Sequence, residues 1–426
     1  MSNIIYELFE NINNSDYIVA SYYLRLEKNV DPYEKAKSFA IGQSLGTWVK
    51  VPGITDEMRK KYMGKIVNIV EVPASDLVDD SILEYRDYIF SIAYPFDNFG
   101  PKFPMIMTTL LGNDASTSTQ AKLIDIYMPK KFTDMFDGPN FGIEGLREVS
   151  GVKDRPILLN MIKPCLGFKA EAGAEIFYQT ALGGVDLIKD DELLANPSYC
   201  TLEDRLDKYI EASNRAYEET GKKTLYVPNI TDHVDKILDN AKMAVDKGAK
   251  LVMLNFASVG IDVLQYLTKN IDVPVIAHYA SAGPYYESAF SGIASNLFLG
   301  KFARMAGADV VMINTPYGGY PLKKSRYLRA AHELMLDHPS YKKTMPCCGG
   351  GVNPGIVPTY IKQLGKDIML AAGGAVQGHP DGAESGVKAM IQSIESACQG
   401  IDLNEARKNH KELDKALEIW GIDDRL

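Results

Sequence analysis

Eight short apolar segments recur from Ile157 onward, and they constrain the fold more than any other feature of the chain. Each ends in polar or glycine residues and is followed by a stretch that can form an amphipathic helix. Continuous apolar strands that alternate with helices are typical of a parallel sheet covered by helices. Eight such units predict a (β/α)8 barrel, whose active site lies at the C-terminal ends of the strands. The segments are ILLNMIKP (157–164), VDLIKDDE (185–192), TLYVPNITD (224–232), LVMLNF (251–256), VPVIAHYA (273–280), DVVMINTP (309–316), TMPCCGGG (344–351) and DIMLAAGGA (367–375).

The first third of the chain has a different pattern. Segments of alternating polarity, such as DYIVASYYLRL and KIVNIVEVP, flank a helical stretch, DPYEKAKSFAIGQ (31–43). This mixture predicts a small α+β domain with a partly exposed antiparallel sheet. We therefore expect an N-terminal α+β domain over residues 1–130, a barrel domain over 131–400, and a charged surface helix as a tail over 401–426.

Composition narrows the class of protein. At 426 residues the chain exceeds the size of a single hydrophobic core, which agrees with two domains. Its 46 basic and 55 acidic residues give a net charge of −9, and no basic stripe offers a nucleic-acid surface. The five scattered cysteines, with no CxxC pair, favour reduced cytosolic thiols over disulfides or structural zinc. We see neither a signal peptide nor an apolar run of about 20 residues, so we expect a soluble cytoplasmic protein.

Charged residues at the ends of the apolar segments need an explanation, because apolar side chains fill a barrel interior. Lys163 ends the first segment, Lys189, Asp191 and Glu192 end the second, and His278 follows the fifth. In a barrel these ends converge on one mouth. Carboxylates there can bind magnesium, which keeps its other positions for water and substrate. The alternative, a rim salt bridge between Lys189 and Asp191, is the weaker explanation because Lys163 and His278 share the mouth.

Glycines close the seventh and eighth segments, at 349–351 and at Gly373 and Gly374. Glycine lets backbone N–H groups approach an anion closely, and phosphate sites in barrels commonly follow strands 7 and 8. Glycine turns are also common for structural reasons alone. The position of these glycines favours a phosphate site.

Longer motifs resemble the RuBisCO large-chain superfamily over nearly the whole chain. The most specific is GGVDLIKDDE (183–192), which follows IKPCLG in the first barrel unit. The resemblance implies a ferredoxin-like N-terminal domain, a C-terminal (β/α)8 TIM barrel, and a homodimer whose active site is completed by the N-terminal domain of the partner. The other motifs are GTW (46–48), LLGN (110–113), FDGPNFGIEGLR (136–147), GVKDRPILLNMIKPCLG (151–167), GKFARMAGAD (300–309) and AGGAVQGHPDG (372–382).

The resemblance also implies roles for individual residues. Lys189 is similar to the lysine that takes up CO2 as a carbamate and then binds Mg²⁺ with Asp191 and Glu192. Lys163 is similar to the lysine that transfers protons, and His278 occupies the position of the strand-5 histidine. Residues contributed by the partner subunit match Asn113, Thr47 and Trp48, and the phosphate cradle matches Gly350, Gly351, Gly373 and Gly374.

Departures from the family pattern decide the expected reaction. Cys165 replaces a second lysine of the carboxylases, while Tyr279 and Met312 replace the arginine and histidine that hold a second phosphate. The lid-loop lysine has no counterpart near Gly319. Each lost charge-assisted bond is worth roughly 1.5–3 kcal/mol, so a second phosphate should no longer be held.

The remaining metal, lysine and single phosphate cradle suit proton abstraction next to a carbonyl. The pattern resembles RuBisCO-like proteins of the form IV type. It predicts Mg²⁺-dependent enolisation of a singly phosphorylated keto-sugar, such as a methylthioribulose or diketo-sugar phosphate, without CO2 fixation.

Three other functions remain open. The same chemistry would serve a decarboxylase, or a transcarboxylase and hydrolase, of a 3-oxo sugar-acid phosphate if Lys323 or Lys324 faced the substrate carboxylate. A non-catalytic scaffold is disfavoured by the intact metal set. Ribulose-bisphosphate carboxylase activity is disfavoured by the lost second phosphate site.

The roles of several individual side chains are open to more than one interpretation. His278 either faces the site or is a buried histidine satisfied by the backbone. Cys165 is either a small filler or a reactive thiol, His379 is expected in a turn, and the role of His233 is open. Loop tyrosines either line the substrate pocket or pack the lid; they are Tyr279, Tyr285, Tyr286, Tyr317 and Tyr320.

Overall fold

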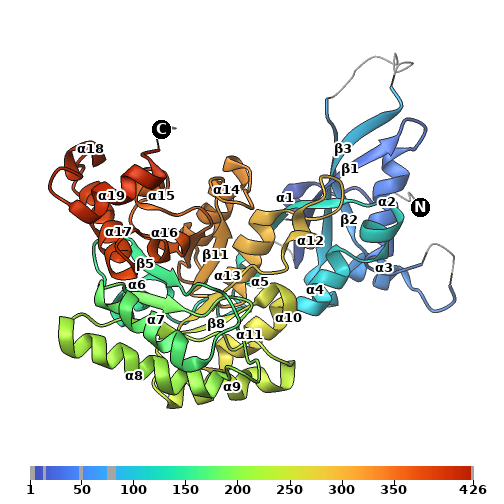
Figure 1. The fold of residues 1–426 in the computed structure, drawn as a ribbon. Coiled ribbons are helices and arrows are strands. Elements are labelled where there is room, and N and C mark those ends of the chain that lie inside the picture. Colours follow the sequence, from blue (N-terminus) through green and yellow to red (C-terminus); the bar gives the residue numbers. More distant parts are fainter. Residues whose placement is uncertain (1–4, 13–15, 48–50, 74–82, 424–426) are drawn as a thin grey trace. The chain divides into compact units, whose positions relative to one another are not determined.

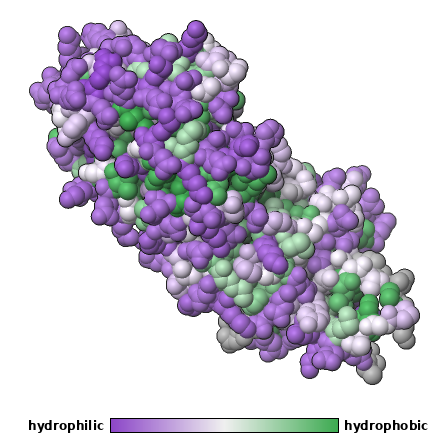
Figure 2. Space-filling view, turned by 90° about the horizontal axis from the view of Figure 1, so that it is seen from below, coloured by the Kyte–Doolittle hydropathy of each residue, from purple (hydrophilic) through white to green (hydrophobic). Residues whose placement is uncertain are grey.

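The computed structural model describes residues 5–12, 16–47, 51–73 and 83–423. The chain forms two compact units, which we describe separately (Figure 1). Unit 1 comprises Met1–Asp137 and Ala282–Phe298, and unit 2 comprises Gly138–Ser281 and Leu299–Leu426. Figure 2 shows a face on which hydrophilic side chains predominate and hydrophobic ones gather in small areas. Among the described residues we find no helix with the length and apolar composition needed to span a membrane.

Unit 1 is an α+β domain built on a sheet of order β10-β4-β1-β3-β2. Strands β1 to β4 pair antiparallel, in the succession β1-α2-β2-β3-α4-β4. This is the βαββαβ arrangement of ferredoxin-like domains, which confirms the expected fold of this part. The strands are β1 (Tyr17–Glu27), β2 (Lys65–Glu71), β3 (Tyr85–Pro95), β4 (Lys122–Tyr127) and β10 (Gly292–Ile293), and the helices are α1 (Phe9–Ile12), α2 (Pro32–Gly42), α3 (Asp56–Tyr62), α4 (Phe103–Leu110), α5 (Lys130–Thr133) and α12 (Gly283–Tyr286).

Local sequence explains the first helix of this domain. The side chain of Asp31 caps α2 by accepting hydrogen bonds from the N–H groups of Tyr33 and Glu34, and Pro32 occupies the first turn. Ala36 and Phe39 are buried on the helix face toward the sheet, as their spacing predicted.

The segment Ala282–Phe298 was expected in the barrel domain, but it belongs to unit 1. Its short strand β10 pairs in parallel with β4, where Gly292 faces Lys122 and Ile293 faces Leu123. The Lys122 ammonium also donates a hydrogen bond to the carbonyl oxygen of Tyr286. A two-residue strand leaves too little pattern for its pairing to be predicted.

Unit 2 is the predicted barrel, and all eight apolar segments form its strands. The parallel order is β7-β6-β5-β13-β12-β11-β9-β8, and a bridge between Asn229 and Met253 joins the two end strands. Figure 1 shows α7, α8 and α9 on the outside of these strands. The strands are β5 (Ile157–Met161), β6 (Leu187–Lys189), β7 (Leu225–Val227), β8 (Val252–Leu254), β9 (Val275–Ala277), β11 (Val310–Asn314), β12 (Met345–Gly349) and β13 (Met369–Ala372). The helices are α6 (Gly142–Ser150), α7 (Ala170–Leu182), α8 (Leu202–Thr220), α9 (Val234–Asp246), α10 (Phe256–Val259), α11 (Ile261–Asn270), α13 (Ala303–Met305), α14 (Lys324–Met335), α15 (Val357–Leu364), α16 (Gly374–Gln377), α17 (Ala383–Cys398), α18 (Leu403–Ala406) and α19 (Lys411–Trp420).

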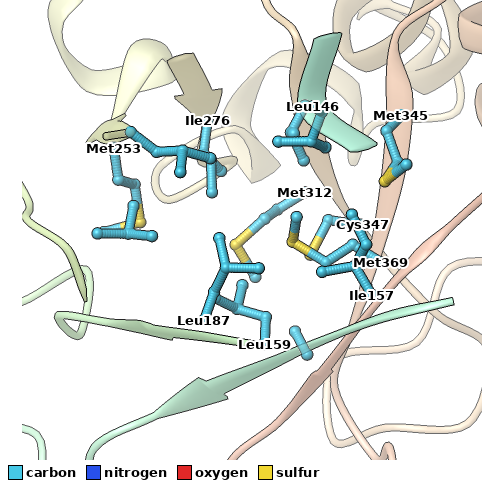
Figure 3. Packing of buried hydrophobic residues seen from close by; sticks show 14 of the residues in the cluster. Leu146, Ile157, Leu159, Leu187, Met253, Ile276, Met312, Met345, Cys347 and Met369 are labelled. Carbon is cyan, nitrogen blue, oxygen red and sulfur yellow. The ribbon is translucent and has the colours of Figure 1, made fainter. Parts of the chain in front are cut away.

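Side chains fill the barrel interior, so it is a packed core and not a pore (Figure 3). Leu146 of α6 packs into the same cluster, so this helix covers one end of the barrel. Unbranched methionines fill irregular space between the branched residues. The labelled members in Figure 3 are Leu146, Ile157, Leu159, Leu187, Met253, Ile276, Met312, Met345, Cys347 and Met369.

The C-terminal segment differs from the single surface helix that we expected. It forms two short helices, α18 and α19, and an apolar cluster of Leu403, Ala406, Leu413 and Leu417 is buried beneath them. The ring of His379 also contacts the carbonyl oxygen of Glu412 at 3.0 Å. The high charge of the segment concealed its apolar face.

A buried carboxylate ties the N-terminal end of the barrel together. Asp309, which precedes β11, is 1% exposed. Its Oδ1 accepts hydrogen bonds from the N–H groups of Phe141 and Gly142 at 2.8 Å, and its Oδ2 accepts one from Val275 at 3.0 Å. One side chain therefore joins β11, β9 and the start of α6.

We expect Asp309→Ala to lower the free energy of unfolding by roughly 3 kcal/mol or more, because three buried N–H groups lose their acceptor. Asp309→Asn should cost less, since one oxygen remains to accept two of these bonds. Urea unfolding measures both values. The control is Asp337→Ala, which changes a side chain that is 96% exposed and should have almost no effect. Equal stability of Asp309→Ala and the control would contradict this account.

Candidate active site

A fully buried lysine ends strand β6. Lys189 is 0% exposed, its Nζ donates a hydrogen bond of 2.8 Å to the carbonyl oxygen of Asp190, and it lies 3.5 Å from Oε2 of Glu192. Burial lowers the pKa of Lys189, and the nearby carboxylates of Glu192 and Asp191 oppose this shift only in part. The neutral form of the Lys189 amine is therefore favoured more than in an ordinary lysine.

A second lysine reaches the same carboxylates from the loop after β5. Nζ of Lys163 donates hydrogen bonds to Oδ2 of Asp191 at 2.8 Å and to Sγ of Cys165 at 2.9 Å. Burial opposes the charged form of Lys163, but the bonds to Asp191 and Cys165 outweigh it and raise the pKa of the amine. Burial would also raise the pKa of Asp191, yet hydrogen bonds from Lys163 and Cys165 lower it. The two residues form an ion pair.

His278 follows β9 and is 3% exposed. Its Nδ1 accepts a hydrogen bond from the N–H of Ala280, so the ring proton resides on Nε2, which lies 3.5 Å from Oε2 of Glu192. Burial, and then the charge of Lys189, lower the pKa of His278 well below its usual value. Both interpretations of this residue hold in part: it is buried and bonded to the backbone, and it also faces the carboxylates.

The set of side chains fits a divalent cation. The Asp191 and Glu192 oxygens both face positive or N–H groups, which is the environment that a hard cation supplies to carboxylates. In the part of the chain that the structure describes, no three His, Cys, Asp or Glu side chains form a metal site by themselves. Asp191 and Glu192 could hold such an ion only together with a further oxygen ligand, which a carbamate on Lys189 would provide.

The glycines of the expected phosphate cradle lie at the ends of β12 and β13. Gly350 and Gly351 have φ values of +90° and +74°, and a side chain on Gly351 would lie 2.5 Å from the carbonyl oxygen of Tyr317. A methyl group on Gly373 would approach the Lys163 side chain at 3.5 Å. Gly374 differs, because a methyl group there would meet no described protein atom within 4 Å. Packing does not require glycine at this position, whereas close approach of a ligand would.

The expected contributions of a partner subunit fall in unit 1. Asn113 is exposed next to the turn that follows α4, and Thr47 is half-buried. Trp48 lies outside the described residues. The roles of these residues remain predictions.

Two of the positions that depart from the family pattern, Met312 and Tyr279, pack against the barrel core. Met312 is 2% exposed within the barrel core, and Tyr279 packs against the same core with its ring stacked on His278 at 5.0 Å. Lys323 and Lys324 are exposed at the start of α14. Gly319 is exposed in the preceding loop.

The other candidates separate into structural and exposed residues. Tyr317 packs, because its hydroxyl accepts a hydrogen bond from Gln363 and its ring meets Tyr360 edge-on. Tyr320 is 82% exposed. His379 sits in a turn, as expected, and His233 is exposed at the start of α9. Tyr285 and Tyr286 belong to unit 1, whereas Tyr279, Tyr317 and Tyr320 belong to unit 2.

An unexpected ion pair holds the base of the site. Asp190, which follows Lys189 in the KDDE motif, pairs with Arg205 of α8, and both side chains are fully buried. Its Oδ2 also accepts hydrogen bonds from the Tyr226 hydroxyl at 2.8 Å and the Asn229 N–H at 2.9 Å. A signal for this pair was present in the sequence, because Arg205 lies on the otherwise apolar face of its helix next to Leu206.

Comparisons with known proteins agree with this fold. A family model described as the ribulose bisphosphate carboxylase large chain, N-terminal domain, matches residues 8–132, and the model of its catalytic domain matches residues 142–420. A ribulose bisphosphate carboxylase-like protein of Archaeoglobus fulgidus is 42% identical over 415 residues, which cover 96% of this chain and 95% of the relative. A 2,3-diketo-5-methylthiopentyl-1-phosphate enolase of Geobacillus thermodenitrificans is 37% identical over 410 residues, with coverage of 95% and 98%.

Solved structures of related proteins have a similar fold. A rubisco-like protein (MtnW) from Alicyclobacillus acidocaldarius has a TM-score of 0.88 at 33% identity, covering 95% of this chain and 100% of that one. A dimeric archaeal rubisco from Hyperthermus butylicus has a TM-score of 0.86 at 31% identity, with 96% of each chain covered. By sequence and by fold, this chain belongs to the RuBisCO large-chain family, as its barrel motifs indicated.

Proposed function

We propose that the protein enolises a singly phosphorylated keto-sugar at the barrel mouth. The substrate that we favour is a diketo-sugar 1-phosphate, because relatives that match this chain over 95% of its length are named 2,3-diketo-5-methylthiopentyl-1-phosphate enolase. The observation that carries the proposal is the 2.8 Å contact between Lys163 and Asp191. It places an amine suited to proton transfer beside a carboxylate of the proposed metal set.

The proposed metal ligands are Asp191, Glu192 and Lys189 as its carbamate. Bound there, Mg²⁺ would polarise the substrate carbonyl and make the neighbouring C–H group more acidic. CO2 reacts with a neutral amine, and the lowered pKa of Lys189 favours that form. Nε2 of His278 lies 3.5 Å from Oε2 of Glu192, where it would help to orient that carboxylate as a metal ligand.

Lys163 is the residue that we propose to move the proton. In its ion pair with Asp191 the amine is charged, so it can stabilise or protonate the developing enolate oxygen. To remove a proton it must be neutral, which requires a weaker contact with Asp191. The strength of this ion pair therefore decides whether Lys163 acts as an acid or a base.

A single phosphate is proposed to bind at the glycine cradle, with Gly374 facing open space and Gly373 beside Lys163. The apolar setting of Met312 and the stacked ring of Tyr279 provide no cation for a second phosphate. This disfavours ribulose bisphosphate as the substrate. Carbon–carbon cleavage remains the alternative, and it would require Lys323 or Lys324, which are exposed at the start of α14, to face the carboxylate of the substrate.

We further propose a homodimer in which the partner's N-terminal domain completes the site, as the family resemblance implies. A dimeric archaeal rubisco with nearly the same fold supports this assembly. Asn113 would then act in the site of the neighbouring subunit.

The first test is proton exchange. Protein with Mg²⁺, bicarbonate and a diketo-sugar phosphate in heavy water should replace the C–H proton next to the carbonyl by deuterium, as followed by NMR. Asp191→Asn should slow this exchange by about 10²-fold or more, and EDTA should have a similar effect. Asp232→Asn is the matched control, because Asp232 follows β7 but bonds to Asn240, outside the set. Exchange that survives both EDTA and Asp191→Asn would refute the proposed reaction.

The second test addresses the phosphate. Gly374→Ala should raise KM roughly tenfold and weaken inhibition by inorganic phosphate similarly, because a methyl group would displace the anion from one hydrogen bond. The melting temperature should not change, since the methyl group meets no described protein atom. Gly283→Ala in unit 1 also adds a methyl group in open space and should leave KM unaltered. An unchanged KM in Gly374→Ala would place the phosphate elsewhere.

The third test addresses the shared site. Asn113→Ala and Asp191→Asn should each be inactive alone. Co-expression of the two variants should restore about a quarter of the activity, because half of the dimers are mixed and each has one intact site. Gel filtration should show the dimer in every sample. No recovery in the mixed dimers would show that both residues act within one subunit.

A further inference from the structure

Two buried carboxamides hold the main chain of the proposed metal-binding segment. Asn229 follows β7 and Asn255 follows β8, and they are 0% and 8% exposed. Nδ2 of Asn229 donates to the carbonyl oxygens of Asp191 at 3.3 Å and Glu192 at 3.2 Å. Nδ2 of Asn255 donates to the carbonyl oxygen of Glu192 at 2.8 Å. Strands β7 and β8 thus fasten the segment that follows β6.

Thr231 fixes the orientation of the Asn229 side-chain amide. Its N–H and its hydroxyl both donate to Oδ1 of Asn229, at 3.1 and 2.7 Å, so the Nδ2 group of Asn229 must be the one that faces the carbonyls. The Thr231 hydroxyl also accepts a hydrogen bond of 3.0 Å from the N–H of Asn255. The two residues are therefore connected as one unit, through Thr231 and through the Glu192 carbonyl oxygen that both side chains contact.

These hydrogen bonds do not involve the carboxylate groups of Asp191 and Glu192. Both carboxamides contact only main-chain oxygens of Asp191 and Glu192, so neither competes for a carboxylate oxygen. From the other side, the buried pair of Asp190 with Arg205 anchors the start of the same segment. The backbone is held from two directions while the carboxylates face Lys163 and Lys189.

One acceptor in this unit is unused. Oδ1 of Asn255 is buried and has no hydrogen-bond partner within the described ranges of the chain. A buried polar atom without a partner costs about 1–3 kcal/mol. A polar group that bound beside Asn255 would remove this cost.

We propose that Asn229 and Asn255 are positioning residues for divalent-cation binding, which act by orienting the main chain of Asp191 and Glu192. This inference rests on the proposed function, because it assumes that those two carboxylates bind the cation. Partners that orient metal ligands typically contribute a factor of about 10–100 to metal affinity. Their contribution should thus be measurable without turnover.

The experiment measures binding of Mn²⁺, used as a paramagnetic substitute for Mg²⁺, by electron paramagnetic resonance of the whole protein in bicarbonate. Asn255→Ala should raise the Kd about 10–100-fold. Asn255→Leu, which has nearly the same shape without a donor, should do the same and guards against a packing defect. The control is Asn240→Ala, because Asn240 donates to Asp232 from α9 and does not contact the carboxylate segment. Its Kd should match that of the wild type.

A double variant tests whether the carboxamides act together. Both donate to the carbonyl oxygen of Glu192, so Asn229→Ala with Asn255→Ala should weaken binding by less than the product of the single effects. Urea unfolding of each variant separates a loss of affinity from a loss of fold.

The outcomes distinguish this inference from the proposed function. If the wild type binds no Mn²⁺, both are wrong. If the wild type binds and the two Asn255 variants bind within about twofold of it, only the positioning role is wrong. Loss of affinity that merely parallels loss of fold, or that is equal in Asn240→Ala, would likewise overturn it.

Discussion

The arrangement of the barrel mouth depends on one costly feature, a lysine amine with no exposure to water at the end of β6. A buried ammonium is strongly disfavoured unless a carboxylate accompanies it, and Glu192 lies 3.5 Å from the Lys189 nitrogen. A second ion pair, between Lys163 and Asp191, lies beside it. Structure alone does not require two lysines and two adjacent carboxylates in one mouth, because apolar residues would fill it at lower cost. Such clusters occur where charge is used chemically.

The barrel was predictable because each of its strands is a continuous apolar segment bounded by polar or glycine residues, and that signal is local. Two other features could not be predicted from a local sequence signal. The segment that contains β10 leaves the barrel sequence to pair with Leu123, far away in the chain, through only two residues. In the C-terminal tail, Leu413 and Leu417 are spaced for a buried helix face, but charged neighbours dilute the signal.

The site was predictable to the level of its motifs but not of its partners. Three consecutive acids follow Lys189, and composition cannot tell which of them enters the mouth. The alternation of side chains along extended backbone answers this for two of them. It sends Lys189 and Asp191 to the interior and Asp190 toward the helices, where Arg205 meets it. It does not account for Glu192, which lies in the turn after the strand and also faces Lys189. The carboxamides of Asn229 and Asn255 contact main-chain oxygens of the KDDE segment. Because every residue has a main-chain oxygen, no sequence motif could have predicted these contacts.

Cys165 occupies the position where the family resemblance implies a second lysine in the carboxylases, and it changes the chemistry of its neighbour Lys163. Two adjacent ammonium groups would lower each other's pKa, which would supply a neutral amine as a base. A thiol at 2.9 Å exerts no such repulsion, so the contact with Asp191 dominates and the pKa of Lys163 rises. The acid–base state of this single lysine is then controlled by one carboxylate that also belongs to the proposed metal set. In the proposed function, cation binding and proton transfer would thereby be coupled, because both would depend on the Asp191 carboxylate.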